Sequence, residues 1–259
     1  MKHFMIAALL LCSATFTFVQ GQGLYWQSTT EGAAGKHTEE SFAVSKMFKM
    51  VRTSGTNDGS IMIARLDKQL FWTLNPEKKT YTEMTFDDME KMMSKGSAQM
   101  DKMKEKMKTM PEEQRKMMEK MMGVQNDQPV EVKKTGETKS VAGYKCTKFI
   151  ALRGEEEVMT LWVTKDLTGF EPLMADWKEF SQRMSAMTAR FSKGTSEMYK
   201  NIDGFPMETT IKIMNNTVTT TVTNVEKRSI PSAEFDIPAG YKKVKSEMKE
   251  SMQKMDNGE

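Results

Sequence analysis

The sequence has very little histidine and cysteine, the side chains that most often carry metal binding and nucleophilic chemistry. Each occurs twice in 259 residues, and only His37 and Cys146 lie beyond residue 21. A single remaining cysteine cannot form an internal disulfide, and we expect it to be a small buried residue on a strand. His37 lies in a polar run that suggests no serine or cysteine partner, so we expect a solvated loop histidine.

Recognisable catalytic and cofactor motifs are also missing. The sequence contains no phosphate-binding loop, dinucleotide fingerprint or zinc-ligand spacing. Three consecutive carboxylates at 155–157 either make a charged turn, which we favour, or supply paired acids for hydrolysis. We therefore predict no catalytic residues, no metal ligands and no cofactor, in a protein that is not an enzyme.

An excess of charge of one sign is absent as well. The formal net charge is +3, from 38 basic and 35 acidic residues. There is no basic block and no alternation of basic with aromatic residues, which is the electrostatic footprint of a nucleic-acid binder. We expect no nucleic-acid partner.

The one long apolar run lies at the N-terminus. Lys2 precedes mainly apolar residues at 4–18, which is the charge pattern and length of a secretory signal peptide. The run is shorter than the roughly 20 residues that a membrane-spanning helix needs. We expect residues 1–21 to be a signal peptide cleaved after Gly21, and the mature chain to be periplasmic or secreted with no stable transmembrane segment. Cys12 leaves a lipoprotein anchor as a minor alternative.

Beyond the leader, short apolar or alternating runs are separated by turn residues. Asn-Asp-Gly at 57–59, Asp-Lys at 67–68 and Asn-Pro at 75–76 favour tight hairpins. Between 207 and 213 apolar and polar residues alternate, which predicts a strand with one buried face. The expected antiparallel strands are 41–52, 60–66, 69–74, 80–84, 130–135, 144–152, 158–164, 207–214 and 217–226.

Methionine is the residue in excess, with 27 in the chain and 12 of them between Met84 and Met122. Apolar residues at steps of three and four over 86–110 predict an amphipathic helix, with Thr85 as its N-cap. Pro111 predicts a kink and a second short helix that ends at Gly123. A similar stripe predicts another helix over 172–193.

These patterns predict an α+β fold, in which a curved antiparallel sheet or incomplete β-barrel has Met-rich helices packed on or over its concave face. A single β-rich domain would span 22–244, with helical inserts at about 86–122 and 172–193. Residues 245–259 would form a charged, Met-containing tail.

Several short blocks resemble an uncharacterised family of exported bacterial domains of unknown function, the DUF4412-like domains, over about residues 24–244. Members of that family resemble the periplasmic lipoprotein carriers of the LolA and LolB kind. The resemblance implies an incomplete antiparallel barrel closed by helices over an apolar cavity, and a hydrophobic cargo; it implies no catalytic residues. The blocks lie at 49–52, 70–76, 80–81, 143–147, 161–167, 204–206 and 230–241.

Three interpretations of the methionines follow. The first is an exported binding module that holds a lipid, an acyl chain or another hydrophobic ligand, because methionine adapts to irregular apolar partners. The second is binding of Cu(I) or Ag(I) by the thioethers of Met100, Met103, Met107 and Met110. The third is that methionine replaces leucine in ordinary helix packing. The expected cavity residues of the first are Trp72, Met89, Met93, Met100, Met103, Trp177, Phe180 and Met184. The sequence predicts no particular protein partner.

Overall fold

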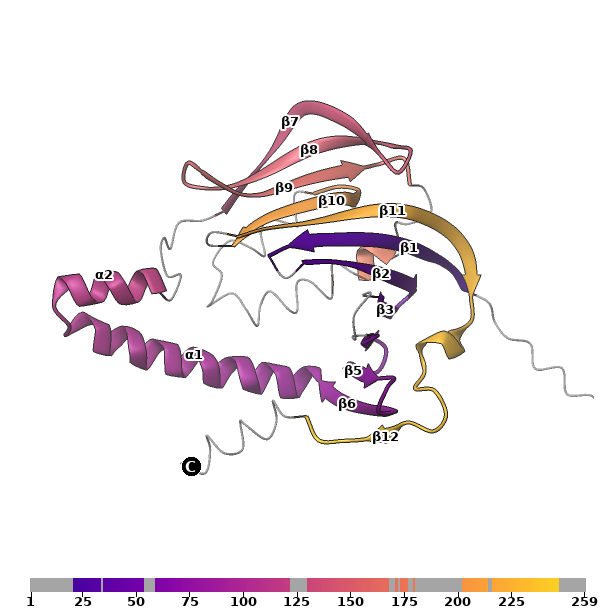
Figure 1. Cartoon of the computed structure of the whole chain (residues 1–259), viewed down its shortest axis with the longest axis horizontal. Helices are drawn as coiled ribbons and strands as arrows, with labels where there is room; N and C mark the ends of the chain where they lie inside the picture. Colours follow the sequence, from indigo (N-terminus) through magenta and orange to yellow (C-terminus); the bar gives the residue numbers. More distant parts are fainter. Residues whose placement is uncertain are drawn as a thin grey trace, which may run out of the picture.

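A single large sheet forms the centre of the molecule. The computed structural model describes residues 21–33, 35–53, 59–121, 130–167, 171, 173–176, 179, 202–213 and 216–246. Within these ranges, twelve strands form an open sheet in the order β12-β6-β5-β4-β3-β2-β1-β11-β10-β9-β8-β7 (Figure 1). The strands are β1 (Gly21–Gly32), β2 (Gly35–Val44), β3 (Met47–Thr53), β4 (Ile61–Arg65), β5 (Leu70–Asn75), β6 (Thr80–Thr85), β7 (Val130–Val141), β8 (Tyr144–Arg153), β9 (Glu156–Thr164), β10 (Phe205–Ile213), β11 (Asn216–Ile230) and β12 (Lys242–Lys243).

Neighbouring strands are antiparallel, except that β12 runs parallel to β6 at one edge. Near the middle of the sheet β1 pairs with β11, which brings an early and a late strand of the described chain together. The predicted strand at 41–52 is wrong, because it is two strands, β2 and β3. A tight turn at Ser45 and Lys46 separates them, and Lys46 has a φ of 59°. Lysine rarely adopts this conformation, so the sequence carries no turn signal there.

The register divides the central strands into two faces. Residues directly opposite each other in a ladder lie on the same face. Trp26 is opposite Ser41, and Ser41 is opposite Met50, so these three share one face, which we call the cavity face. The alternate residues, Tyr25 and Phe42, lie on the opposite face.

The opposite face has its own apolar core beneath the C-terminal part of the chain. The 3-10 helix η2 (Ser232–Phe235) places Phe235 against this core, where its side chain is fully buried. Arg65 holds the same segment through hydrogen bonds from Nη1 to the carboxylate of Asp236 at 2.8 Å and to the carbonyl of Phe235 at 3.3 Å. The core residues are Val44, Ile63, Trp72, Leu74, Ile230 and Phe235.

Arg65 also binds Asp67 through two hydrogen bonds, from Nε at 2.9 Å and from Nη2 at 2.7 Å. The hydrogen bonds from this guanidinium lower the pKa of Asp67 below its ordinary value of 3.8, against the opposing effect of burial. A carboxyl whose pKa is lowered by folding stabilises the folded state when it is ionised, and the stabilisation is lost as the pH falls through the folded-state pKa.

We therefore expect Asp67→Asn to lower the urea midpoint of unfolding by a constant amount above about pH 5. The difference from the wild type should shrink as the pH falls below 3.8 and should vanish once Asp67 is protonated in both states. Urea titrations of both proteins between pH 7 and pH 2 measure this. A difference that stays constant to the lowest pH would contradict the role of the ion pair.

The N-terminal end of the first helix matches its prediction. Helix α1 (Phe86–Lys108) begins directly after β6, and a capping box closes its first turn. The hydroxyl of Thr85 accepts from the backbone N–H of Asp88 at 3.0 Å, and the Asp88 carboxylate accepts from the N–H of Thr85 at 3.2 Å. After Pro111 the chain continues as α2 (Glu112–Met121). The predicted cap and interruption are confirmed.

The predicted α+β class, with helices packed over the concave face, is wrong. The described fold is mainly β, and Figure 1 shows α1 running away from the end of β6 with α2 at its far end. The side chains of Met103 and Met117 are 40% and 67% exposed, so the methionine stripe is not buried as a whole against the sheet. A helical stripe shows that some apolar partner is favoured, but it does not specify the sheet as that partner. No helix among the described residues is long and apolar enough to cross a bilayer.

Candidate functional site

A cavity of about 800 Å³, which we call the large cavity, lies on the cavity face over the central strands. Its lining comes from β1, β2, β3, β9, β10 and β11, and from helical residues 173–176. Trp26 is one of the lining residues, with its ring edge-on to Phe205 at 5.5 Å and tilted against Phe48 at 5.8 Å between ring centroids. The apolar lining residues include Trp26, Phe48, Leu161, Leu167, Leu173, Met174, Phe205 and Val222.

Polar side chains occupy one part of the same cavity. Ser28, two residues beyond Trp26 on β1, is 4% exposed, and Thr209 and Thr220 lie opposite each other on β10 and β11. The hydroxyl of Thr220 is 2.9 Å from that of Thr30. Within the described part of the chain, the hydroxyls of Ser28 and Thr209 have no hydrogen-bond partner. Both residues line the large cavity.

Charged groups lie among the lining residues and are mostly paired. The Lys165 ammonium binds the Asp203 carboxylate, and this hydrogen bond lowers the pKa of Asp203. The backbone N–H of Lys46 donates to the carboxylate of Asp176 at 2.9 Å. That hydrogen bond connects the β2–β3 turn to residues 173–176. Within this segment, Leu173 and Met174 pack against a buried apolar cluster that contains the lining residues Phe205 and Val222.

Gly204 lies among the lining residues, where the chain enters β10, and its φ of 129° is accessible essentially to glycine alone. A Cβ at this position would contact the carbonyl oxygen of Thr164 and would lie 2.8 Å from Cγ1 of Val163. Glycine is therefore required for the backbones of β9 and β10 to approach each other beside the cavity.

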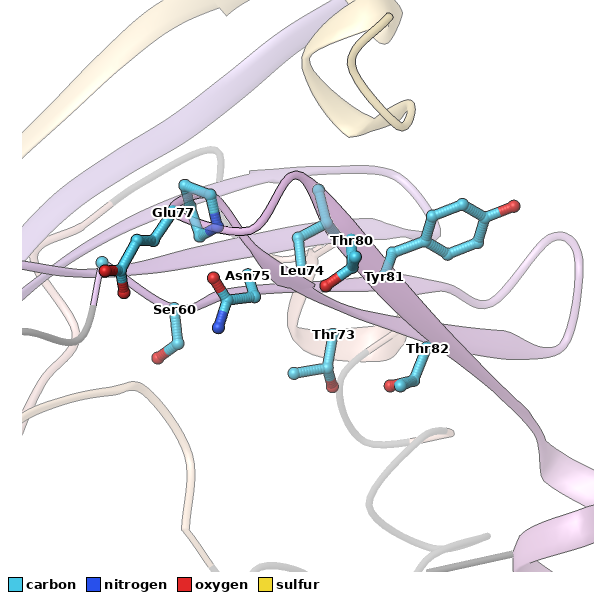
Figure 2. Close-up of a pocket in the computed structure, with 10 residues that line it drawn as sticks. Ser60, Thr73, Leu74, Asn75, Glu77, Thr80, Tyr81 and Thr82 are labelled. Carbon is cyan, nitrogen blue, oxygen red and sulfur yellow. The ribbon is translucent and has the colours of Figure 1, made fainter. Parts of the chain in front are cut away.

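A second, smaller pocket of about 240 Å³ lies at the β5–β6 end of the sheet. Figure 2 shows Ser60, Asn75, Thr73 and Thr82 on one side of the ribbon. Thr73 is opposite Met62 and Thr82, and Met62 is opposite Met50, so this pocket opens on the cavity face. Its lining is rich in hydroxyl groups.

The predicted cavity residues are found elsewhere or lie beyond the description. Trp72 is opposite Ile63, which is opposite Lys49, so the register places it on the opposite face from Trp26. There it is buried, and its indole N–H donates to the Glu83 carboxylate at 3.0 Å. Met89 and Met103 belong to α1, and neither is among the described residues that line the large cavity. The side chains of Met93 and Met100, and all of Trp177, Phe180 and Met184, lie outside the described structure.

The alternative thioether set is only partly described. Met107 is buried at 4% exposure, Met110 is half-buried and Met103 is 40% exposed, while the side chain of Met100 lies outside the description. The described residues contain no cluster of three or more His, Cys, Asp or Glu side chains that would hold a metal ion. Thioether binding of Cu(I) or Ag(I) remains a prediction.

Cys146 and His37 have definite positions. Cys146 lies on β8 and is fully buried, which confirms the prediction of a small buried residue on a strand, and burial raises the pKa of its thiol. The prediction of a solvated loop histidine is wrong, because His37 lies on β2 with its side chain 22% exposed. Its Nε2 is 3.2 Å from the Glu39 carboxylate.

Sequence reasoning missed the residues that line the large cavity. Trp26 and Ser28 lie in β1, whose glycines and threonines obscure an otherwise regular alternation of Leu24, Trp26 and Ser28. Counting that alternation would have found the strand. The approach of β1 to β11 carries no local signal, because the two strands are separated by most of the chain.

A family model described as Domain of unknown function (DUF4412) matches residues 87–241, which is more than half of the chain. No curated protein matches the sequence significantly. Among solved structures, the chain is similar to PNGF-II at a TM-score of 0.38, with 11% identity over 90% of this chain and 32% of the other. It is similar to MucB in complex with MucA(peri) at a TM-score of 0.40, with 8% identity over 84% of this chain and 55% of the other.

The MucA/MucB complex of Pseudomonas aeruginosa gives a TM-score of 0.42, with 7% identity over 85% of this chain and 57% of the other. The chain thus spans from a third to less than three-fifths of the length of these structures. At such TM-scores the similarity carries no conclusion about function. The likeness to lipoprotein carriers stays an expectation.

Proposed function

The chain belongs to the family called Domain of unknown function (DUF4412), and we propose that it is an exported, non-enzymatic binding module that holds a hydrophobic ligand in the cavity beside Trp26. The ligand is a lipid, an acyl chain or another apolar molecule. The single observation that carries the proposal is a cavity of about 800 Å³ with a mainly apolar lining.

The size and lining of the cavity support this function. Ligand pockets in proteins typically enclose about 300–1,000 Å³ and combine apolar walls with a few polar groups. Trp26, Phe48 and Phe205 make an aromatic wall, which offers a large apolar area without many rotatable bonds. A molecule that covers this wall would release ordered water from it and gain free energy in proportion to the apolar area buried.

The proposed lack of enzymatic activity draws support from the kind of side chains at the cavity. The described lining residues include neither histidine nor cysteine, and the lysine and aspartate at Lys165 and Asp203 are bound to each other. Export is proposed from the N-terminal sequence alone.

Contact quenching of tryptophan tests the site. A bromine-labelled acyl compound quenches a tryptophan that it touches, so we expect dibromostearoyl glycerol to quench the wild-type protein when it is purified without detergent. Trp26→Phe should remove much of this quenching, whereas Trp72→Phe should leave it unchanged, because Trp72 lies on the opposite face of the sheet.

Native mass spectrometry of the gently purified protein provides a second measurement. We expect a bound apolar molecule at a ratio of one per chain. The proposal fails if the protein is always empty and if no brominated compound, whatever its headgroup, quenches Trp26.

A further inference from the structure

Polar residues form two adjacent rows across the cavity face. In the first row, Ser28 of β1 is opposite Glu39 of β2, and Glu39 is opposite Arg52 of β3. The backbone N–H of Arg52 then donates to the carbonyl of Ser60 at 3.0 Å, which extends this row toward the hydroxyl-lined small pocket. Successive strands are about 4.8 Å apart, so Ser28 and Arg52 are separated by roughly 10 Å.

The second row lies beside the first and is made mostly of threonine. His37 of β2 is opposite Thr30 of β1, Thr30 is opposite Thr220 of β11, and Thr220 is opposite Thr209 of β10. We call the two rows together the polar band. Ser28, Thr209 and Thr220 also line the large cavity, so the polar band begins inside it.

Glu39 is the centre of the charged part of the band. Its carboxylate accepts hydrogen bonds from Arg52 Nε at 3.3 Å and Nη2 at 3.2 Å, and lies 3.2 Å from His37 Nε2. The Glu39 side chain is 13% exposed. Glu39 and Arg52 carry opposite formal charges, so this ion pair adds no net charge to the band.

The charges around the rest of the cavity also come close to cancelling. Lys46 and Lys165 lie among three lining carboxylates, those of Glu171, Asp176 and Asp203. An anionic headgroup would therefore meet more negative than positive charge. A quaternary ammonium headgroup has neither a hydrogen-bond donor nor an acceptor, so it would leave the hydroxyls of Ser28 and Thr209 without a hydrogen bond. Hydroxyl groups face no such conflict, because they both donate and accept hydrogen bonds.

We infer that the ligand is an amphiphile whose acyl chain lies against the Trp26 wall and whose uncharged, hydroxyl-bearing headgroup lies on the polar band. This inference rests on the proposed function and adds the chemical class of the ligand. Monoacylglycerol is the simplest molecule of this class. Its glycerol hydroxyls would lie among the hydroxyls of the polar band, of which those of Ser28 and Thr209 have no partner within the described residues.

A series of ligands with one acyl chain and three headgroups tests the inference. We expect monopalmitoylglycerol to bind at least tenfold more tightly than palmitate and than hexadecyltrimethylammonium. Each is added below its micelle-forming concentration, and displacement of the apolar fluorescent probe N-phenylnaphthylamine gives the affinity. Free glycerol is a control that should not displace the probe, because it lacks the acyl chain.

Removal of single hydroxyls gives the matched variants. Ser28→Ala and Thr209→Val should each weaken monopalmitoylglycerol by about threefold to tenfold, the effect of one lost hydrogen bond, when its affinity is expressed relative to that of the probe, which carries no hydroxyl group. Thr29→Val is the control, since Thr29 adjoins Ser28 in β1 but lies on the opposite face.

The outcomes separate the two proposals. If the probe binds, and palmitate binds at least as tightly as monopalmitoylglycerol, the headgroup inference is wrong. The proposed binding module is then unaffected. The headgroup inference is also wrong if monopalmitoylglycerol binds with equal affinity to Ser28→Ala, Thr209→Val and Thr29→Val. Absence of binding by the probe and by all three amphiphiles contradicts the proposed function itself.

Discussion

Replacement of Gly204 by alanine is expected to lower the free energy of unfolding by about 3 kcal/mol or more. Two costs add at this position. A φ of 129° is strained for any residue with a side chain, at about 1–3 kcal/mol, and the new methyl group overlaps the backbone of β9, at a similar cost. The Thr164 carbonyl cannot move away without breaking the pairing of β9 with β10.

Thermal unfolding followed by circular dichroism measures this effect. Gly143→Ala is the matched control, because Gly143 also has a positive φ, of 83°, but a Cβ there would meet no atom within 4 Å. We expect the control to lose only about 1 kcal/mol, the cost of the backbone conformation alone. Equal losses in the two variants would show that the close approach of the strands at Gly204 is unimportant.

Replacement of Phe235 by alanine is expected to lower the free energy of unfolding by about 3–5 kcal/mol, the usual cost of a large aromatic residue lost from a core. Phe235 is fully buried, and it joins the 3-10 helix to the core on the opposite face. The same change exposes the hydrogen bond that the Arg65 guanidinium donates to the backbone carbonyl of Phe235.

Urea titration at neutral pH measures the loss, and Phe235→Leu, which retains much of the buried area, should lose much less. Because Phe235 and Trp26 lie on different faces, the folded fraction of the alanine variant should bind N-phenylnaphthylamine with unchanged affinity. A stable Phe235→Ala protein would mean that the C-terminal segment contributes little to the fold.

Local signals in the sequence predicted local structure well. Thr85 and Asp88 are three residues apart, and the capping box depends on that spacing alone. Pro111 interrupts the helix for an equally local reason, since its ring prevents the regular hydrogen-bond ladder. By contrast, the turn at Lys46 depends on a backbone conformation that lysine rarely adopts, so residue type gives no warning of it.

The lining of the large cavity depends on long-range pairing, and this is why the methionines and Trp72 did not point to it. Trp72 is apolar and lies in a strand, but a strand has two faces, and only the ladder from β5 through β3 to β1 shows which face it occupies. A one-residue difference in register reverses the answer. Amphipathic periodicity likewise shows that a helix favours an apolar partner without identifying that partner.

The pairing of β1 with β11 has a consequence for how the chain folds. Thr30 and Thr220, which meet in the middle of the sheet, are 190 residues apart in the sequence. At a synthesis rate of about 5–20 residues per second, β1 waits roughly 10–40 s for its partner strand to be made. Contacts of such high sequence separation also slow folding itself, because a long loop must close first. The sheet therefore cannot be completed on a partly synthesised chain.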